Sequence, residues 1–386
     1  YAYAYLLPFC LESFWRHTLL WLADAMRLAS VRCFSSCVQS SKIPIINISP
    51  WVDRASKADM HRSALELGRA FETTGFALIC GHGIPNETVQ ELHRATVAFY
   101  DGPQHLKDEI RAEPVFGAQG FHAQGHENVS QLLGDFSRPP DAVERITVRN
   151  LHHFMTGSNA VLEAGDSSFG GPGTAAPKLP SLPGFRATTE AYFDAVHGLF
   201  QMLNRMSEHA LDLPDGFFDP FYGQSMGSSM QLGHYLHSGL ADGELAFGEH
   251  TDSISLNILV TDAPGLEVFL ADGWHAVPII EGAFVVNVGR LLSRWTNDRW
   301  LAAVHRVKKP PQRKLTITSA FWLRGDATIE CLPSCQGPGL PPKYAPITAA
   351  EFLHKRHLLH IPPEQRAPEE REIPREFWEA ALPSRL

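Results

Sequence analysis

The pattern of apolar and polar residues divides the chain into a mainly helical first part and a second part made of short strands. Apolar residues spaced three and four apart predict helices over 64–73 and 86–99, and a long helix after Gly184 that ends at Pro214. From Ser229 onward the period shortens to two, which predicts strands. Because helices come first and strands follow, we expect an α+β protein.

The strand candidates in the second part are short and are separated by turn residues such as Ala271-Asp272-Gly273. Many short strands of this kind indicate an antiparallel sandwich or barrel rather than a doubly wound parallel sheet. A further buried strand is predicted earlier, over 75–81, where an apolar run is closed by glycine at both ends. The candidates in the second part cover residues 230–235, 253–260, 265–270, 283–288 and 315–323.

Changes in composition divide the chain into several segments. Residues 1–42 differ from the rest, and residues 157–183 are rich in Gly, Ser and Pro, which is typical of a flexible insertion. The expected divisions are a leader over 1–42, an N-terminal region over 43–156, the insertion over 157–183, a long helix and its connection over 184–228, the core over 229–340 and a C-terminal helical tail over 341–386.

The leader contains a stretch from Met26 that is rich in Arg and Ser and lacks acidic residues. This composition is typical of an organellar transit peptide that begins at an internal Met, and the alternative is a non-native extension. We accordingly expect the protein in the cytoplasm, or in mitochondria or plastids if the segment from Met26 is a transit peptide.

Composition and charge narrow the class of protein. The chain has 386 residues, a formal net charge of −9 and 44% hydrophobic residues, which is ordinary for a globular protein. This excludes a mainly disordered or collagen-like protein, and the negative charge argues against nucleic-acid binding. The apolar run at 19–23 is too short to cross a bilayer, so no membrane partner is expected. None of the six cysteines forms a Cys-x-x-Cys pair, which favours a reduced protein.

One histidine among the 19 stands out because a carboxylate follows it at a spacing of two, in His250-Thr-Asp252. On a strand these side chains project to the same face, about 6.6 Å apart along the chain, and can converge on one metal ion. His305 is the third candidate ligand. Two histidines and one carboxylate leave three positions of an octahedral Fe(II) free, as in the facial triad of non-haem iron oxygenases. Catalytic zinc is the alternative that these ligand types allow.

A series of short motifs surrounds these residues, in the order Pro44–Ile48, Thr74–Pro85, Leu232–Tyr235, His250–Asp252, Gly265–Val268, Gly282–Gly289 and His305–Val307. With them the sequence resembles the 2-oxoglutarate/Fe(II)-dependent dioxygenases of the isopenicillin N synthase-like branch, over most of the chain. The resemblance implies a double-stranded β-helix (jelly roll) core with flanking N-terminal and C-terminal helices. It also implies that His250, Asp252 and His305 bind Fe(II), and that 2-oxoglutarate and O2 are co-substrates.

The chain departs from the family where the far carboxylate of 2-oxoglutarate is bound. The family usually has Arg-x-Ser on the strand after the distal histidine, and the two possible alignments place Lys314 and Thr316, or Thr316 and Thr318, at these positions. All three share one parity and should face the same way, whereas Arg313 points to the other face. A lysine would bind the carboxylate as a point charge, and a threonine pair as neutral donors. Tyr235 is a further candidate contact, or else an aromatic residue at the edge of the core.

Several other residues are assigned supporting roles. Asn287 is expected to orient the backbone near the site, and Trp295 and Trp300 are expected to pack in the core. Because Phe321 and Trp322 are adjacent on a predicted strand, only one of them can face the pocket.

The sequence thus predicts an Fe(II)-dependent oxygenase that couples oxidative decarboxylation of 2-oxoglutarate to the oxidation of a small organic molecule. Hydroxylation is the default outcome, and desaturation and cyclisation are related outcomes. One alternative is an iron oxidase that takes its electrons from the substrate itself, as isopenicillin N synthase does. Another is a non-catalytic metal-binding protein on the same fold. No nucleic-acid or membrane partner is expected, and no oligomeric state is predicted.

Overall fold

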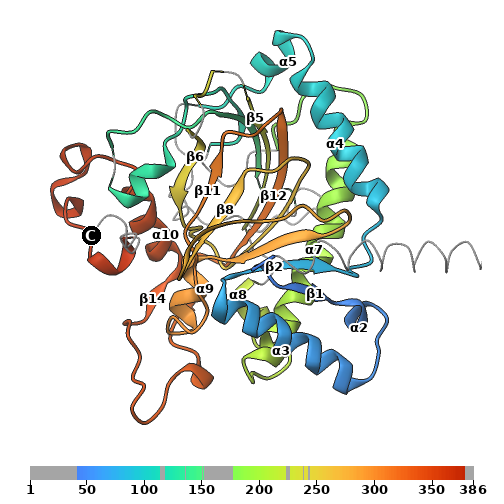
Figure 1. Cartoon of the computed structure of the whole chain (residues 1–386). Coiled ribbons are helices and arrows are strands. Elements are labelled where there is room, and N and C mark those ends of the chain that lie inside the picture. Colours follow the sequence, from blue (N-terminus) through green and yellow to red (C-terminus); the bar gives the residue numbers. More distant parts are fainter. Residues whose placement is uncertain are drawn as a thin grey trace, which may run out of the picture. The chain divides into compact units, whose positions relative to one another are not determined.

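Two sheets that face each other form the centre of the protein (Figure 1). The computed structural model describes residues 41–113, 118–134, 136–149, 151, 177–222, 227–237, 239–241 and 244–378. Apart from residues 41 and 42, the predicted leader lies outside this part of the chain, as do residues 157–176 of the predicted insertion. The described residues from Ile43 onward belong to one unit.

Eight strands in the described part of the second half build the core, and they divide equally between the two sheets. The larger sheet contains the order β10-β7-β12-β5, and the smaller sheet has the order β6-β11-β8-β9. Strands that alternate between two facing sheets in this way make a jelly roll, so the predicted fold is confirmed. The strands are β5 (Gly227–Tyr235), β6 (Leu245–His250), β7 (Leu256–Thr261), β8 (Leu266–Leu270), β9 (Gly273–Ala276), β10 (Phe284–Val288), β11 (His305–Lys308) and β12 (Lys314–Trp322).

The described part of the N-terminal region also supplies four strands to the larger sheet, and only the one predicted over 75–81 was expected. One pair extends the sheet beyond β10, and another pair extends it beyond β5. The second pair places residues of the N-terminal region beside the centre of the jelly roll. These strands are β1 (Ile45–Asn47), β2 (Phe76–Cys80), β3 (Gly120–His122) and β4 (Val143–Arg149).

Helices cover the outer face of the larger sheet, and the main apolar core lies between them (Figure 1). Phe200 of α7 stacks on Phe321 of β12 with ring centroids 4.3 Å apart. Trp295 and Trp300 are buried in the same core, as predicted. The α-helices are α2 (Ser49–Val52), α3 (Lys57–Thr73), α4 (Asn86–Tyr100), α5 (Gln104–Glu109), α7 (Phe185–Ala210), α8 (Asp219–Tyr222), α9 (Arg290–Trp295) and α10 (Ala349–Leu358).

The C-terminal segment returns to the jelly roll through α10. This helix begins at a capped end, because the hydroxyl of Thr348 accepts a hydrogen bond of 3.2 Å from the backbone N–H of Glu351. Its buried side includes Phe352 and Arg356. None of the described helices is long and apolar enough to cross a membrane. The remaining short elements are η1 (Val129–Leu133), β13 (Thr328–Ile329), η3 (Pro333–Cys335), β14 (Ile347–Thr348), η4 (Pro363–Gln365), η5 (Pro368–Glu370) and η6 (Arg375–Phe377).

Candidate metal centre

The structure brings His250, Asp252 and His305 together at one end of the smaller sheet. His250 is the last residue of β6 and His305 is the first residue of β11, and the two are direct partners in the register of these antiparallel strands. Asp252 lies beyond the end of β6. The expectation that residues 250 and 252 share one face of a strand was therefore wrong in its geometry. The carboxylate reaches the histidines because the chain has already left the strand.

Backbone carbonyls orient both imidazole rings. His250 Nδ1 lies 3.0 Å from the carbonyl oxygen of Gly248, and His305 Nδ1 lies 3.2 Å from that of Ala303. A carbonyl can only accept, so each Nδ1 carries the proton and each Nε2 has a free lone pair. The Nε2 atoms face Asp252, at 3.7 Å from Oδ1 for His250 and 3.8 Å from Oδ2 for His305.

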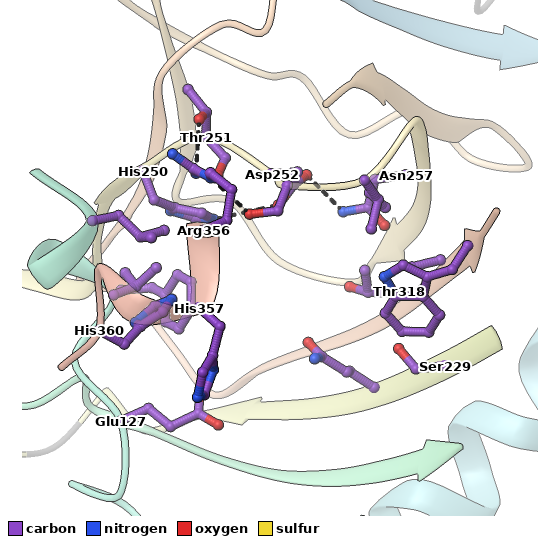
Figure 2. Close-up of a pocket in the computed structure, with 18 of the residues that line it drawn as sticks. Glu127, Ser229, His250, Thr251, Asp252, Asn257, Thr318, Arg356, His357 and His360 are labelled. Carbon is purple, nitrogen blue, oxygen red and sulfur yellow. Dashed lines mark hydrogen bonds and ion pairs between the residues drawn. The ribbon is translucent and has the colours of Figure 1, made fainter. Parts of the chain in front are cut away.

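Two asparagines hold the carboxylate of Asp252. The side-chain amides of Asn287 on β10 and Asn257 on β7 donate hydrogen bonds of 2.7 Å and 2.9 Å to Asp252 Oδ2. Figure 2 shows the bond from Asn257. Asn287 was predicted to orient the backbone, but its amide orients the carboxylate itself. Ligands supported in this way keep a fixed direction toward a metal.

The protonation states suit a cation site. Burial and the neighbouring His305 lower the pKa of His250 to about 3, so its imidazole is neutral. Burial would raise the pKa of Asp252, but the two histidines and the amide donors outweigh it and hold this pKa below its usual value. The site thus presents a neutral His250 imidazole and an ionised Asp252 carboxylate at neutral pH.

The donor set fits an octahedral Fe(II). The candidate ligand atoms of the three residues all lie within 4.8 Å of one another. Ligand bonds to such metals are about 2.1 Å long, so the mutually cis ligands of a facial triad lie about 3 Å apart around the ion. The distances from the two Nε2 atoms to the carboxylate, 3.7 Å and 3.8 Å, are less than 1 Å longer, so small side-chain movements would close the triad on the ion. No described cysteine belongs to this cluster.

Two cavities meet at the triad. The smaller cavity, of about 90 Å³, is lined by His250, Asp252 and His305 and extends to Tyr235 and Lys314. The larger cavity, of about 170 Å³, is lined by His250 and Asp252 and extends along β12 as far as Trp322. Figure 2 shows the larger cavity. A single metal at the triad would be reached from both sides.

Comparison with known families covers both halves of the chain. Residues 43–160 match the model of the N-terminal region of the non-haem dioxygenase in morphine synthesis. Residues 227–325 match the model of the 2OG-Fe(II) oxygenase superfamily, and this range contains all three triad residues. The chain belongs to the 2OG-Fe(II) oxygenase superfamily. The predicted 2-oxoglutarate-dependent Fe(II) oxygenase is thereby confirmed as its functional class.

Curated relatives of the oxygenase cover most of its length. The 2-oxoglutarate-Fe(II) type oxidoreductase hxnY of Emericella nidulans is 28% identical over 323 residues, which cover 80% of this chain and 88% of the relative. The validamycin A dioxygenase of Streptomyces hygroscopicus subsp. limoneus is 28% identical over 339 residues, covering 83% and 87%.

Solved structures show the same fold. A 2OG-Fe(II) oxygenase family protein from Caulobacter crescentus superposes with a TM-score of 0.68 at 25% identity, covering 82% of this chain and 98% of that one. A full-length protein of Neurospora crassa, solved in complex with alpha-KG and thymine, gives a TM-score of 0.68 at 24% identity, covering 83% and 97%.

The residues that replace the usual Arg-x-Ser line the smaller cavity of this oxygenase. Lys314, Thr316 and Thr318 face it together, as their shared parity predicted, and Tyr235 lines it too. Arg313 points away and forms a 2.7 Å ion pair with Asp101. Trp322 lines the larger cavity, whereas the adjacent Phe321 is buried in the core, as the alternation requires.

The register of β12 with β5 places Lys314 and Thr318 at different positions along the smaller cavity. Lys314 is paired with Tyr235, and Thr318 is paired with Gln231. Thr318 lines both cavities, whereas Lys314 lines only the smaller one. The Nζ of Lys314 donates to the hydroxyl of Thr261 and the carbonyl of Ala263. Lys314 therefore lies at the end of the smaller cavity that is farther from the larger one.

Sequence reasoning missed two groups of site residues. Arg145 and Arg149 of β4 line the larger cavity, although the N-terminal region was expected to contribute mainly helices. Arg356 of α10 hydrogen-bonds to both neighbours of Asp252, at 3.2 Å from the carbonyl of Thr251 and 3.0 Å from the hydroxyl of Ser253. Arg356 comes four residues after the apolar Phe352, so the two share one face of the helix. A charged residue on an apolar helix face was the sequence signal that could have indicated its buried role.

Proposed function

We propose that His250, Asp252 and His305 bind Fe(II), that the smaller cavity binds 2-oxoglutarate, and that the larger cavity binds the small molecule that is oxidised. The observation that carries this proposal is the meeting of two separate cavities at one triad. A co-substrate that chelates the metal from one side leaves the other side open to the substrate.

The proposed reaction class is the chemistry that Fe(II) and 2-oxoglutarate would supply when bound at this site. With O2, Fe(II) and 2-oxoglutarate supply an oxidant that removes hydrogen from a C–H bond, while the co-substrate is converted to succinate and CO2. In hydroxylation one oxygen atom enters the substrate and the other enters succinate. The protein would hold three metal positions, keeps the His250 imidazole neutral through burial, and would place the target bond at the triad.

Lys314 is the proposed anchor for the far carboxylate of 2-oxoglutarate. It is the one cation among the four candidates at Tyr235, Lys314, Thr316 and Thr318. It is 1% exposed and lines the smaller cavity at the end away from the larger one. Gly233, opposite Thr316, leaves this cavity open, because a Cβ there would lie 2.7 Å from Thr316 Oγ1. Tyr235 and Thr316 can then donate hydroxyl hydrogen bonds to the same carboxylate.

A small organic molecule is the proposed substrate class. The larger cavity is limited to about 170 Å³, which suits a small molecule rather than a polymer. The name of a relative, validamycin A dioxygenase, likewise refers to a small molecule. Hydroxylation is the proposed outcome.

The test is the release of CO2 from carboxyl-labelled 2-oxoglutarate by the full-length protein with Fe(II) and O2. We expect slow turnover without any added substrate, and its loss in His305→Ala. His275→Ala, which removes a histidine paired with Asp272 on the same sheet, is the matched control and should keep the turnover. Absence of turnover together with absence of 2-oxoglutarate binding by the iron-loaded protein would refute the proposal. Absence of iron binding would favour a non-catalytic protein.

A further inference from the structure

Three neighbouring strands form the wall of the larger cavity, in the order β12-β5-β4. Directly paired residues face the same side of a sheet, so the wall consists of successive rows. One row contains Thr318 and Gln231, which line both cavities, and the next row contains Ala320, Ser229 and Arg149, which line only the larger one. Rows on one face are about 6.8 Å apart, because two residues separate them along each strand.

The charges on this wall are mainly positive. The described residues that line the larger cavity include three arginines and two carboxylates, and one carboxylate is the metal ligand Asp252. Arg145 forms an ion pair with the other carboxylate, Glu127. Arg356 donates to the carbonyl and hydroxyl oxygens around Asp252. Arg149 and Arg356 carry the other two positive charges of the described lining, and the Arg149 guanidinium is 5.8 Å from the ring of Trp322.

Helix α10 and the turn that follows it close the opposite side of the cavity with two histidines, one from each. Figure 2 shows His357 and His360 across the cavity from Ser229 and Thr318. Burial and then His354 and Arg149 lower the pKa of His357. Burial and then Arg356 and His357 lower the pKa of His360 well below its usual value. Burial is the main cause of both shifts and the neighbouring charged groups add to it, so these two neutral imidazoles can serve as hydrogen-bonding groups.

We propose that the larger cavity binds a small organic carboxylic acid, with its carboxylate in the row of Arg149 and Ser229 and its reactive carbon in the row of Thr318. This inference rests on the proposed function, because it assigns the substrate class of the same site. The two rows place the oxidised carbon roughly 7 Å from the carboxylate along the strands.

A carboxylate matches the groups in this row. A guanidinium presents two parallel N–H donors, which bind a carboxylate at two points, and the hydroxyl of Ser229 adds a third donor. The apolar side chains of Leu132, Phe247 and Trp322 line the rest of the cavity and can contact the body of the acid. The single arginine of the row favours a monocarboxylate over a phosphate ester, which carries nearly two charges.

The test compares acids with their primary amides, which have nearly the same shape without the charge. Benzoate, phenylacetate, 3-phenylpropionate and hexanoate, each with its amide, are titrated by calorimetry into full-length protein loaded with Mn(II) and 2-oxoglutarate without O2. We expect at least one acid to bind tenfold or more tightly than its amide. We expect Arg149→Gln to weaken that acid by roughly 10- to 100-fold and to leave the amide unchanged.

Two further variants make the result specific to the arginine. Arg149→Lys keeps the positive charge but lacks the two parallel N–H donors of the guanidinium, so it should recover part of the affinity for the acid that Arg149→Gln loses. Arg186→Gln removes an exposed arginine paired with Glu190 on α7 and should change nothing. The affinity for 2-oxoglutarate should be the same in all variants, which shows that each is folded.

The outcomes separate this inference from the proposed function. If 2-oxoglutarate neither binds nor is decarboxylated, the proposed function fails. If it is bound and decarboxylated, but no acid of the panel binds more tightly than its amide, the carboxylate site is refuted alone. Tighter binding of phenyl phosphate than of every acid would also overturn it. An acid preference that persists unchanged in Arg149→Gln would reject Arg149 as the binding residue.

Discussion

The role of Lys314 can be tested through its charge, because burial lowers the pKa of its ammonium to about 8 while Asp262 partly opposes this shift. The usual lysine pKa lies above 10, so the charge of Lys314 is lost at an unusually low pH. At pH 7 about nine-tenths of the molecules carry the charge, and at pH 9 about one-tenth do. If the ammonium binds the far carboxylate, the dissociation constant of 2-oxoglutarate should rise about tenfold between these pH values.

The corresponding substitution removes the charge altogether. Lys314→Met keeps an unbranched side chain of similar length in a buried position. Loss of a hydrogen bond to a charged group should weaken 2-oxoglutarate by about 1.5–3 kcal/mol, which is roughly 10- to 150-fold. The affinity for Mn(II) should change little, because Lys314 belongs to the far end of the smaller cavity. The remaining binding should also lose its dependence on pH between 7 and 9.

Titration calorimetry of 2-oxoglutarate into Mn(II)-loaded protein at pH 7, 8 and 9 measures both effects. Lys308→Met is the matched control, because Lys308 is half-exposed, pairs with Glu267 and lies on the neighbouring β11. A wild-type dissociation constant that stays level from pH 7 to 9, or an unchanged affinity in Lys314→Met, would contradict the argument. The anchor would then have to be sought at Thr316 and Thr318.

Three further predictions concern the supports of the triad and the core. Arg356→Gln removes hydrogen bonds to both neighbours of Asp252, so Mn(II) affinity in calorimetry should fall about tenfold while the circular dichroism spectrum is retained. Asn287→Leu removes a 2.7 Å donor to Asp252 and should weaken Mn(II) by about 10- to 100-fold; an unchanged affinity would reject its positioning role. Trp300→Ala should lower the free energy of unfolding by about 3–5 kcal/mol in urea titrations without changing the ratio of Mn(II) to 2-oxoglutarate affinity.

The parts of the fold that could be predicted are those where side-chain pattern and burial agree. The apolar stripe of α7 and the short strands from β5 to β12 follow their periods closely. Strand β4 was not predicted, although polar Arg145, Thr147 and Arg149 alternate in it with the buried Ile146 and Val148. This period of two is typical of a strand with one polar face, but it does not tell whether that face meets solvent or a binding cavity.

The sequence was sufficient to predict which residues belong to the site, but not how far each lies from the metal. The His-x-Asp spacing, together with His305 and the surrounding motifs, selected His250, Asp252 and His305, and strand parity placed Lys314 and Thr318 on one face. Parity cannot say which of them lies nearer the metal, since the pleat repeats every two residues. That depth follows from pairing with β5, a contact between segments about 80 residues apart in sequence.

The arrangement separates the chemistry of this oxygenase from its choice of substrate. Both histidines of the triad are carried by the smaller sheet, and Asp252 follows it in the chain. The wall of the larger cavity comes instead from β12, β5 and β4, with α10 opposite. Strand β4 and helix α10 lie outside the eight core strands, so their cavity residues can change without altering any metal ligand. Arg356 is the exception, because it is on α10 yet holds the neighbours of Asp252. A substitution at Arg149 should therefore alter substrate affinity alone, whereas one at Arg356 should alter metal affinity as well.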